Sequence, residues 1–284
     1  MTARRLIVLV LLSLLAFAGN SILCRLALKQ TTIDPASFTL LRLVSGAMVL
    51  WLATLRAGER QDGAGDWMSA GALAAYAAGF SFAYVSIPAN TGALLLFGSV
   101  QATMIGHAIW SGERLHHVQT AGLLIAMGGL LSLFLPGLQH APPIGGAFLM
   151  CVAGIAWGVY SLRGRRSGDP TRTNAGNFLR AALMALVLSL VLHDTAALDA
   201  AGVGYAIASG AVTSGLGYAL WYAVLPSLKA STAATLQLSV PPLAAFGAVL
   251  FLDEAISMRL IVASVAILGG IGLVLWQRRR SQRT

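Results

Sequence analysis

Apolar residues follow one another in long runs along this chain, and short polar clusters separate the runs. A helix that crosses the roughly 30 Å hydrocarbon core of a bilayer needs about 20 mostly apolar residues. By that measure the pattern predicts an all-α integral membrane protein with ten transmembrane helices. The predicted spans cover residues 6–28, 36–55, 67–85, 89–111, 118–135, 143–162, 174–192, 201–223, 229–252 and 257–276.

The amino-acid composition also indicates an integral membrane protein. Hydrophobic residues make up 57% of the chain and charged residues only 10%, against about 25% charged residues in soluble domains. The net charge of +9 comes from basic residues scattered over short loops, so no nucleic-acid partner is expected. Cys24 and Cys151 both lie within predicted spans. They indicate neither a disulfide framework nor a metal site, and we expect no cofactor.

Basic residues also predict how the chain lies in the membrane. If both termini are cytoplasmic, nearly all loop arginines and lysines fall on the cytoplasmic side, and only Arg25, Lys29 and Arg259 lie outside. Cytoplasmic loops carry the excess of basic residues in membrane proteins, so this orientation is favoured. A cleaved signal peptide is the competing interpretation of the first span. However, the apolar run continues through Ile22 and Leu23, past the point of cleavage.

The second half of the chain repeats the first. A shift of 141 positions aligns several residues in the same order, namely Gly106 with Gly247, Glu113 with Glu254, and Gly128-Gly129 with Gly269-Gly270. We therefore predict two five-helix repeats, residues 1–138 and 139–284. Because five is an odd number of spans, the second repeat must be inverted, an arrangement typical of secondary transporters with a substrate site near the midplane. Glu113 and Glu254 then end the fourth helix of each repeat, and we predict that they are boundary residues.

Three stretches carry a family resemblance: "YALWYAVL" (218–225), "ASTAATLQLSVPPLAAFGAVLFLDEAI" (230–256) and "ILGGIGLVL" (267–275). The chain resembles the EamA-type family of the drug/metabolite transporter superfamily over nearly its whole length. The resemblance implies a multi-pass carrier of the bacterial inner membrane, not an enzyme. It also implies export of amino acids, aromatic or otherwise apolar, or of related metabolites, by alternating access. Pro241 and Pro242 depart from the equivalent residues of the first half, so the two halves need not move identically.

Polar residues inside the spans are candidate contacts for a substrate, because such residues are costly in lipid. Asn20 lies in the middle of the first span, Gln101 in the fourth, and Gln237 and Ser239 in the ninth. Each can line a watery cavity or form a hydrogen bond between helices. The amides favour the cavity, and the hydroxyl groups leave both readings open.

Deep aromatic residues form a second candidate set. They are Tyr76, Phe80 and Tyr84 in the third span, Trp157 and Tyr160 in the sixth, and Tyr218, Trp221 and Tyr222 in the eighth. If these faces turn inward, they form a cavity suited to apolar or aromatic side chains; ordinary helix packing is the alternative. With the family resemblance, these residues predict a central cavity lined by spans 1, 3, 4, 6, 8 and 9. Tryptophans near span ends predict an interfacial belt: Trp51, Trp67, Trp110 and Trp276.

Charged residues inside the spans are few. His107 is the candidate intramembrane proton site, with a helix-packing histidine as the alternative, because no Asp or Glu lies well inside a span. Arg42 and Arg180 occupy equivalent positions two turns into their helices, where each can snorkel to a surface or bind a substrate carboxylate. Pro241 and Pro242 lack an N–H and leave two helix carbonyls without their usual donors, which predicts a hinge.

Two alternatives to a carrier come from other classes. "ERLHH" (113–117) is the best support for a membrane-embedded enzyme, but no second His or acidic cluster joins it. A channel is compatible with the sequence, and saturable counterflow would separate it from a carrier. The expected partners are the lipid bilayer and a small-molecule substrate. The sequence leaves the oligomeric state open, and a monomer is compatible with it.

Overall fold

The computed structural model describes residues 2–56, 64–87, 89–112, 116–134, 143–165, 168–252 and 258–281. Glu113 and Glu254, the predicted boundary residues, lie outside the described residues. The described helices group into ten spans, in agreement with the hydrophobic pattern. The uninterrupted spans are α1 (Ala3–Gln30), α2 (Pro35–Arg56), α3 (Trp67–Ser86), α4 (Ala89–Trp110), α5 (His117–Phe134), α6 (Ile144–Gly164), α7 (Pro170–Val191) and α12 (Met258–Ser281).

The eighth span, which the sequence predicts as one helix, changes its winding twice. It consists of α8 (Ala200–Ala208), a π-helix η3 (Ser209–Leu216) and α9 (Gly217–Val224), and the 3₁₀ turn η4 (Leu225–Ser227) follows. A π-helix is rare and is frequently found at functional sites. The hydroxyl-rich η3 therefore marks this span as a place to look for function.

The ninth span, also predicted as one helix, is broken into α10 (Ala230–Gln237) and α11 (Val240–Leu252). The break has a covalent cause, since Pro241 and Pro242 have no N–H to bond the carbonyls one turn earlier. At the break, the amides of Leu238 and Ser239 bond the carbonyls of Thr235 and Leu236, three residues back instead of four. The helix thus ends where the predicted hinge begins.

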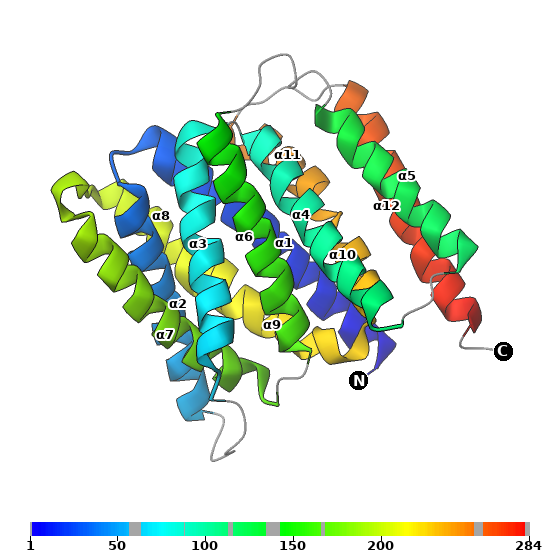
Figure 1. Cartoon of the computed structure of the whole chain (residues 1–284), viewed down its shortest axis with the longest axis horizontal. Coiled ribbons are helices and arrows are strands. Elements are labelled where there is room, and N and C mark those ends of the chain that lie inside the picture. The colour runs from blue at the N-terminus through cyan, green and yellow to red at the C-terminus, as the bar shows by residue number, and fades with distance from the viewer. Residues whose placement is uncertain are drawn as a thin grey trace.

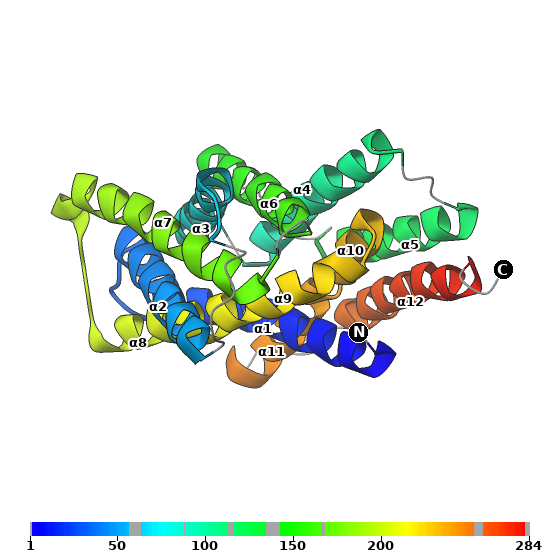
Figure 2. The same ribbon diagram turned by 90° about the horizontal axis from the view of Figure 1, so that it is seen from below.

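The spans lie side by side in a bundle (Figure 1), and α1 begins and α12 ends at the lower edge of the view. α2 pairs with α7 at one side of the bundle, and α5 pairs with α12 at the other. Figure 2, seen from below, shows α3, α6 and α4 in one layer and α8, α1 and α11 in the other. α9 and α10 lie between the two layers.

Exchange of the two halves leaves this packing pattern unchanged. α3 and α4 pack on α6, and their equivalents α8, α9 and α11 pack on α1. α2 packs on its own equivalent α7, and α5 packs on its equivalent α12. The pattern is that of a duplicated repeat in which the helices of each copy pack against those of the other.

Aspartates determine where several spans begin. Asp66, Asp169 and Asp199 cap α3, α7 and α8 by accepting backbone N–H groups of the first turn. Asp34 does the same for α2 through the amides of Ala36 and Ser37. A carboxylate at this position is favoured because it satisfies N–H groups that have no partner within the helix.

Hydrogen bonds join loops of opposite halves at both ends of the bundle. At one end, the amide of Ala197 donates to Asp34 Oδ2 over 2.9 Å, and the amide of Thr32 donates to Asp199 Oδ1 over 3.2 Å. At the other end, Arg180 Nη1 donates to the carbonyl of Ala64 over 2.7 Å. The α1–α2 turn therefore lies beside the α7–α8 connection, and the segment before α3 lies beside α7.

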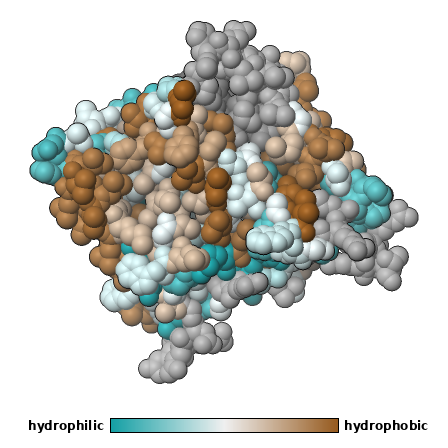
Figure 3. Space-filling view, viewed as in Figure 1, coloured by the Kyte–Doolittle hydropathy of each residue, from teal (hydrophilic) through white to brown (hydrophobic). Residues whose placement is uncertain are grey.

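The outer surface fits a lipid environment. Figure 3 shows brown hydrophobic side chains across the face, with hydrophilic side chains toward its edges. Trp51, Trp67, Trp110 and Trp276 are all more than half exposed, as expected of an interfacial belt. Five helices among the described residues, α1, α2, α3, α6 and α7, are long and apolar enough to cross a membrane. The protein is a multi-pass membrane protein.

Candidate functional site

Most of the predicted binding residues meet in one buried group of side chains, which we call the aromatic cluster. Its centre consists of Tyr76 and Phe80 from α3, Trp157 and Tyr160 from α6, and Tyr218 from α9, all at most 5% exposed. Ring centroids lie 4.6 Å apart for Trp157 and Tyr218, and 5.1 Å apart for Tyr76 and Trp157. Both pairs are tilted, and their centroid distances lie in the range of favourable aromatic contacts.

Two phenylalanines that the sequence analysis missed complete the aromatic cluster. Phe17 of α1 lies 5.2 Å from Trp157 and 5.6 Å from Trp221 between ring centroids. Phe178 of α7 lies 5.6 Å from Tyr218. Phe17 could have been found, because it stands three residues before Asn20 and so shares its helical face. Nothing comparable in the sequence indicates Phe178.

The expectation that Arg42 snorkels to a surface is wrong. Its side chain is 1% exposed and lies inside the aromatic cluster. Arg42 Nε donates to Ser214 Oγ over 2.9 Å, and Nη2 donates to the hydroxyl oxygens of Tyr218 over 2.7 Å and Tyr76 over 3.3 Å. The face of α2 that carries Arg42 packs on α3 and η3, so the guanidinium cannot reach an edge. Arg180 is half-buried and bonds the carbonyls of Ala64 and Gly176.

The π-helix η3 supplies hydroxyl groups to this site. Ser209 Oγ donates to Asn20 Oδ1 over 2.7 Å, and Ser214 Oγ lies 3.5 Å from the same oxygen. The two serines are five residues apart, which is the spacing of the hydrogen bond in a π-helix. Asn20 Nδ2 in turn donates to the Tyr76 hydroxyl over 3.3 Å. The predicted Asn20 is therefore a junction between α1, α3 and η3.

The predicted amides of α4 and α10 both make hydrogen bonds near the break in the ninth span. Gln101 Nε2 donates to the carbonyl of Ala234. That carbonyl is available because the Leu238 amide bonds Thr235 instead. Gln237 Oε1 accepts the indole N–H of Trp157, which ties the break to the aromatic cluster. Ser239 has a local role, since its hydroxyl donates to the carbonyl of Leu236.

The remaining predicted aromatic residues extend the cluster toward its two ends. The ring of Tyr84 lies 4.7 Å from Phe80 at 90°. Trp221 Nε1 donates to Ser161 Oγ over 3.3 Å. Tyr222 lies 4.9 Å from Tyr160 and donates its hydroxyl to the Tyr160 carbonyl.

A cleft reaches the Tyr222 end of the cluster. Its volume is about 460 Å³, and its walls come from α3, α4, α6, α7 and α9 through residues that include Asp66, His107, Arg163 and Tyr222. His107, the candidate proton site, is exposed in this cleft and lies 2.7 Å from Ser111 Oγ. The structure therefore places His107 at the approach to the aromatic cluster and not inside it.

An ion pair and a hydrogen bond connect charged and polar residues at the opening of the cleft. Arg163 Nη2 lies 2.8 Å from Asp66 Oδ1, and Arg163 Nε donates to Ser69 Oγ. Burial alone would raise the pKa of Asp66. The hydrogen bonds from Ser69 and the charge of Arg163 outweigh it and lower the pKa below its usual value. Asp66 therefore stays ionised at neutral pH and keeps Arg163 in place.

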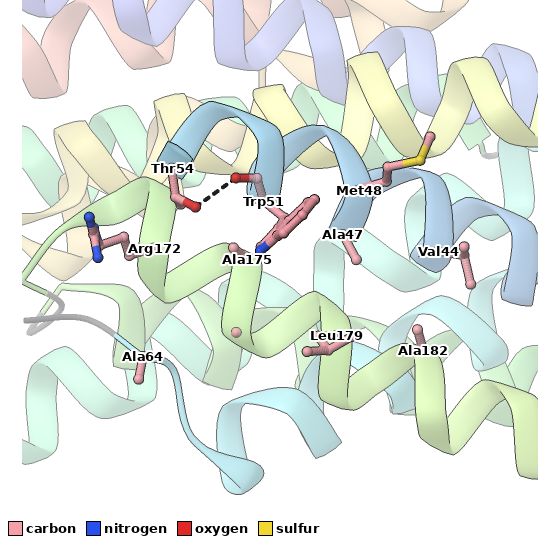
Figure 4. A pocket seen from close by; sticks show the side chains of 11 residues that line it. Val44, Ala47, Met48, Trp51, Thr54, Ala64, Arg172, Ala175, Leu179 and Ala182 are labelled. Atoms are coloured by element: carbon pink, nitrogen blue, oxygen red, sulfur yellow. Dashed lines mark hydrogen bonds between the residues drawn. The ribbon is translucent and has the colours of Figure 1, made fainter. Parts of the chain in front are cut away.

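A second and larger hollow, of about 620 Å³, lies between α2 and α7. Figure 4 shows that Met48 and Trp51 reach it from α2 and that Leu179 and Ala182 reach it from α7. Met48, Trp51 and Leu179 are all more than half exposed. Since these residues belong to the apolar outer surface, we assign this hollow to contact with lipid and not to the substrate site.

Comparisons with known proteins agree with this architecture. The uncharacterized protein PA1977 of Pseudomonas aeruginosa is 53% identical over 279 residues, which cover 98% of this chain and 97% of that protein. A Streptantibioticus cattleyicolor protein named a probable terminal-alkyne amino-acid exporter is 28% identical, and the match covers 84% of this chain and 83% of that protein. One crystal structure shares the fold with a TM-score of 0.76 at 22% identity, covering 93% of this chain and 98% of that chain.

The family match is made twice along the chain. A model of the EamA-like transporter family matches residues 4–135 and again residues 144–276. This family is one of transporters and not of enzymes, which agrees with the sequence expectation. With its duplicated helical halves and the buried site between them, the chain belongs to the EamA-like transporter family.

Proposed function

We propose that this protein exports amino acids with aromatic or other apolar side chains, or related small metabolites, across the bacterial inner membrane. Family membership supports transport. The name of the Streptantibioticus cattleyicolor relative, an amino-acid exporter, supports the substrate class. We further propose that Asn20, Tyr76, Trp157, Tyr218 and Gln237 contact the substrate.

The observation that carries this proposal is the position of the aromatic cluster. Its rings and polar groups come from α1, α2 and α3 of one half and from α6, α7 and α9 of the other. A group in this position can change partners when one half moves against the other. Binding sites of carriers with repeated halves lie at such an interface.

We propose that the two halves are inverted relative to each other and that both termini are cytoplasmic. The hydrogen bond between Ala197 and Asp34 supports inversion, because it brings the first turn of one half beside the second connection of the other. α1 begins and α12 ends at the same edge of the bundle (Figure 1), as an even number of spans requires. The cleft near Arg163 then opens to the cytoplasm, where an exporter collects its substrate.

Transport in our proposal needs no buried carboxylate for coupling. Among the residues described, the acids lie at helix starts or in loops, as Asp66 and Asp199 do. His107 stays the candidate proton site. If it couples transport to protons, His107→Gln will remove the response of transport to a pH gradient. If the rate of exchange is unchanged by dissipating that gradient, uncoupled movement of a net-neutral solute stands.

Counterflow in liposomes tests the function. Vesicles with purified protein are preloaded with unlabelled tryptophan, phenylalanine, threonine, glutamate or a nucleoside, and the matching labelled solute is added outside. We expect tryptophan or phenylalanine to accumulate and Trp157→Ala to abolish accumulation. The matched control is Trp110→Ala, because Trp110 is 91% exposed. Exchange of the nucleoside alone would contradict the amino-acid assignment, and flux without counterflow would indicate a channel.

A further inference from the structure

A positive charge is buried inside the aromatic cluster without a negative partner among the described residues. Arg42 is 1% exposed, and its hydrogen-bond partners are the hydroxyls of Ser214, Tyr76 and Tyr218. The described acidic residues lie elsewhere, where they cap helices or occupy loops. A buried charge is costly unless it is paired, so Arg42 needs a reason to be there beyond packing.

The hydrogen bonds of this guanidinium are incomplete. Arginine offers five N–H donors in a planar fork. Nε and Nη2 of Arg42 are used by hydroxyls, but Nη1 is buried and has no hydrogen-bond partner. Hydroxyls also supply no countercharge. Nη1, with its two N–H groups, is therefore left for an anionic group, and a carboxylate can accept charge-assisted hydrogen bonds from it.

The walls around the guanidinium are aromatic. Its Cζ lies 5.2 Å from the ring centroid of Tyr76 and 5.6 Å from that of Phe80. Tyr218, which accepts the hydrogen bond from Nη2, is 4.6 Å from Trp157 between ring centroids. An anion at Nη1 thus has flat apolar surfaces beside it that suit an apolar or aromatic body.

A continuous series of rings connects Arg42 to the cleft. Tyr222 lines the cleft, and its ring lies 4.9 Å from Tyr160. Tyr160 lies 6.3 Å from Tyr218, whose hydroxyl touches Arg42. Movement of these rings would open a route from the cleft to the guanidinium, and each step of the route is an aromatic contact.

We propose that Arg42 binds the carboxylate of the transported solute, so that the substrates are monocarboxylates with an apolar or aromatic body and need no ammonium group. This inference rests on the proposed function. One carboxylate neutralises the charge of Arg42, whereas an ammonium would find only uncharged acceptors among the described side chains around it, such as the Asn20 oxygen. A second carboxylate, as in glutamate, would have no second buried cation among the residues that the structure describes.

Three related probes test the inference by competition against labelled phenylalanine in counterflow. They are unlabelled phenylalanine, 3-phenylpropionate, which keeps only the carboxylate, and phenylalanine amide, which keeps only the amine. We expect the first two to compete at similar concentrations and the amide to compete at least about 30-fold more weakly, as loss of one partner of a buried charge pair implies. Equal competition by the amide in the wild-type protein overturns the inference.

Variants of Arg42 and Arg180 separate an effect on carboxylate recognition from an effect on the stability of the protein. Arg42→Gln should weaken competition by 3-phenylpropionate about 30-fold while leaving that by the amide unchanged, and Arg42→Lys should restore part of the preference. Arg180→Gln is the matched control, because Arg180 is the equivalent residue of the other half and bonds backbone carbonyls. An unchanged preference for the acid in Arg42→Gln contradicts the inference.

A binding measurement covers the case of a poorly folded variant. Thermal melting of the purified wild-type protein is followed with 3-phenylpropionate and with 3-phenylpropionamide, and we expect only the acid to raise the melting temperature. If neither compound does so, the inference fails even if phenylalanine is exchanged. If no amino acid is exchanged but the acid still stabilises the protein, the proposed function fails and the carboxylate site stands.

Discussion

The side-chain amide of Gln101 on α4 donates a hydrogen bond to the backbone carbonyl of Ala234 on α10. The two residues belong to different halves, and the carbonyl is one that the break in the ninth span has released from its helix. A single glutamine of one half thus supports the point at which the other half bends.

Replacement of Gln101 by leucine should destabilise the protein. The Ala234 carbonyl would be buried without a donor, at a cost of about 1–3 kcal/mol. Unfolding of the purified protein, followed by circular dichroism in detergent, measures the loss. Gln30→Leu is the control, since Gln30 is exposed at the end of α1. Equal effects of the two changes would show that the bond to Ala234 has no special role.

Restoring a donor at the break should make the ninth span stiffer. Pro241→Ala returns an N–H that can bond the Gln237 carbonyl and continue the helix. We expect a higher melting temperature and a several-fold slower counterflow if this region is the hinge. Pro170→Ala is the control, because Pro170 stands at the first turn of α7, where a missing N–H is harmless. Wild-type transport by Pro241→Ala would remove the hinge from the mechanism.

Close packing of η3 on α2 depends on a glycine. A methyl group at Gly210 would overlap the backbone of Arg42 and the side chain of Ser45. Gly210→Ala should therefore push η3 away from α2 and lower the melting temperature by several degrees. Gly204→Ala, in the same span, meets nothing within 4 Å and should raise helix stability by up to about 1 kcal/mol. Equal melting of the two variants would contradict the close contact.

Stability should depend on pH through the loops at the end of the bundle that contains Asp34. Burial alone would raise the pKa of Asp34, but hydrogen bonds from Ser37, Ala197 and Ala36 lower it below 3.8. A lowered pKa means that the stabilisation is present above about pH 4 and is lost as the pH falls through the folded-state value. The melting temperature should be flat from pH 5 to 7 and decline below about pH 4.

The matched variant identifies the carboxylate responsible. Asp34→Asn should reduce the acid decline, because the neutral amide does not titrate, and the decline that remains belongs to other carboxylates with a lowered pKa, such as Asp66. Asp194→Asn should leave the decline unchanged, since the Asp194 side chain is 88% exposed at the adjacent 3₁₀ turn. A decline that is the same in both variants would assign the acid sensitivity to other groups.

The course of the spans could be predicted from the sequence because hydropathy and length alone decide which segments cross a membrane. The break before Pro241 was also predictable, since proline removes a donor whatever surrounds it. The π-helix was not. Ser209–Leu216 contains no proline, and its winding is tied to contacts with Asn20 and Arg42 that lie far away in the sequence.

The position of Arg42 about two turns into α2 could be predicted from the sequence. The direction of its side chain could not, because it depends on which face of α2 packs inward. The partners that decide this, Tyr76 and Tyr218, are 34 and 176 residues away. The aromatic residues were easier to single out, because rings that share a helical face form a cavity wall wherever that face turns inward.

The π-helix and the break before Pro241 both lie in the second half, whereas α3, the counterpart of the eighth span, is a regular α-helix from Trp67 to Ser86. If the two halves exchanged roles perfectly, the inward-open and outward-open forms would have equal energy. In the proposed alternating-access cycle, we expect a half with two irregular spans to bend more easily than its regular counterpart. The inward-open and outward-open forms would then differ in energy, and without solute the carrier would rest on one preferred side, so that loading and release would proceed at unequal rates.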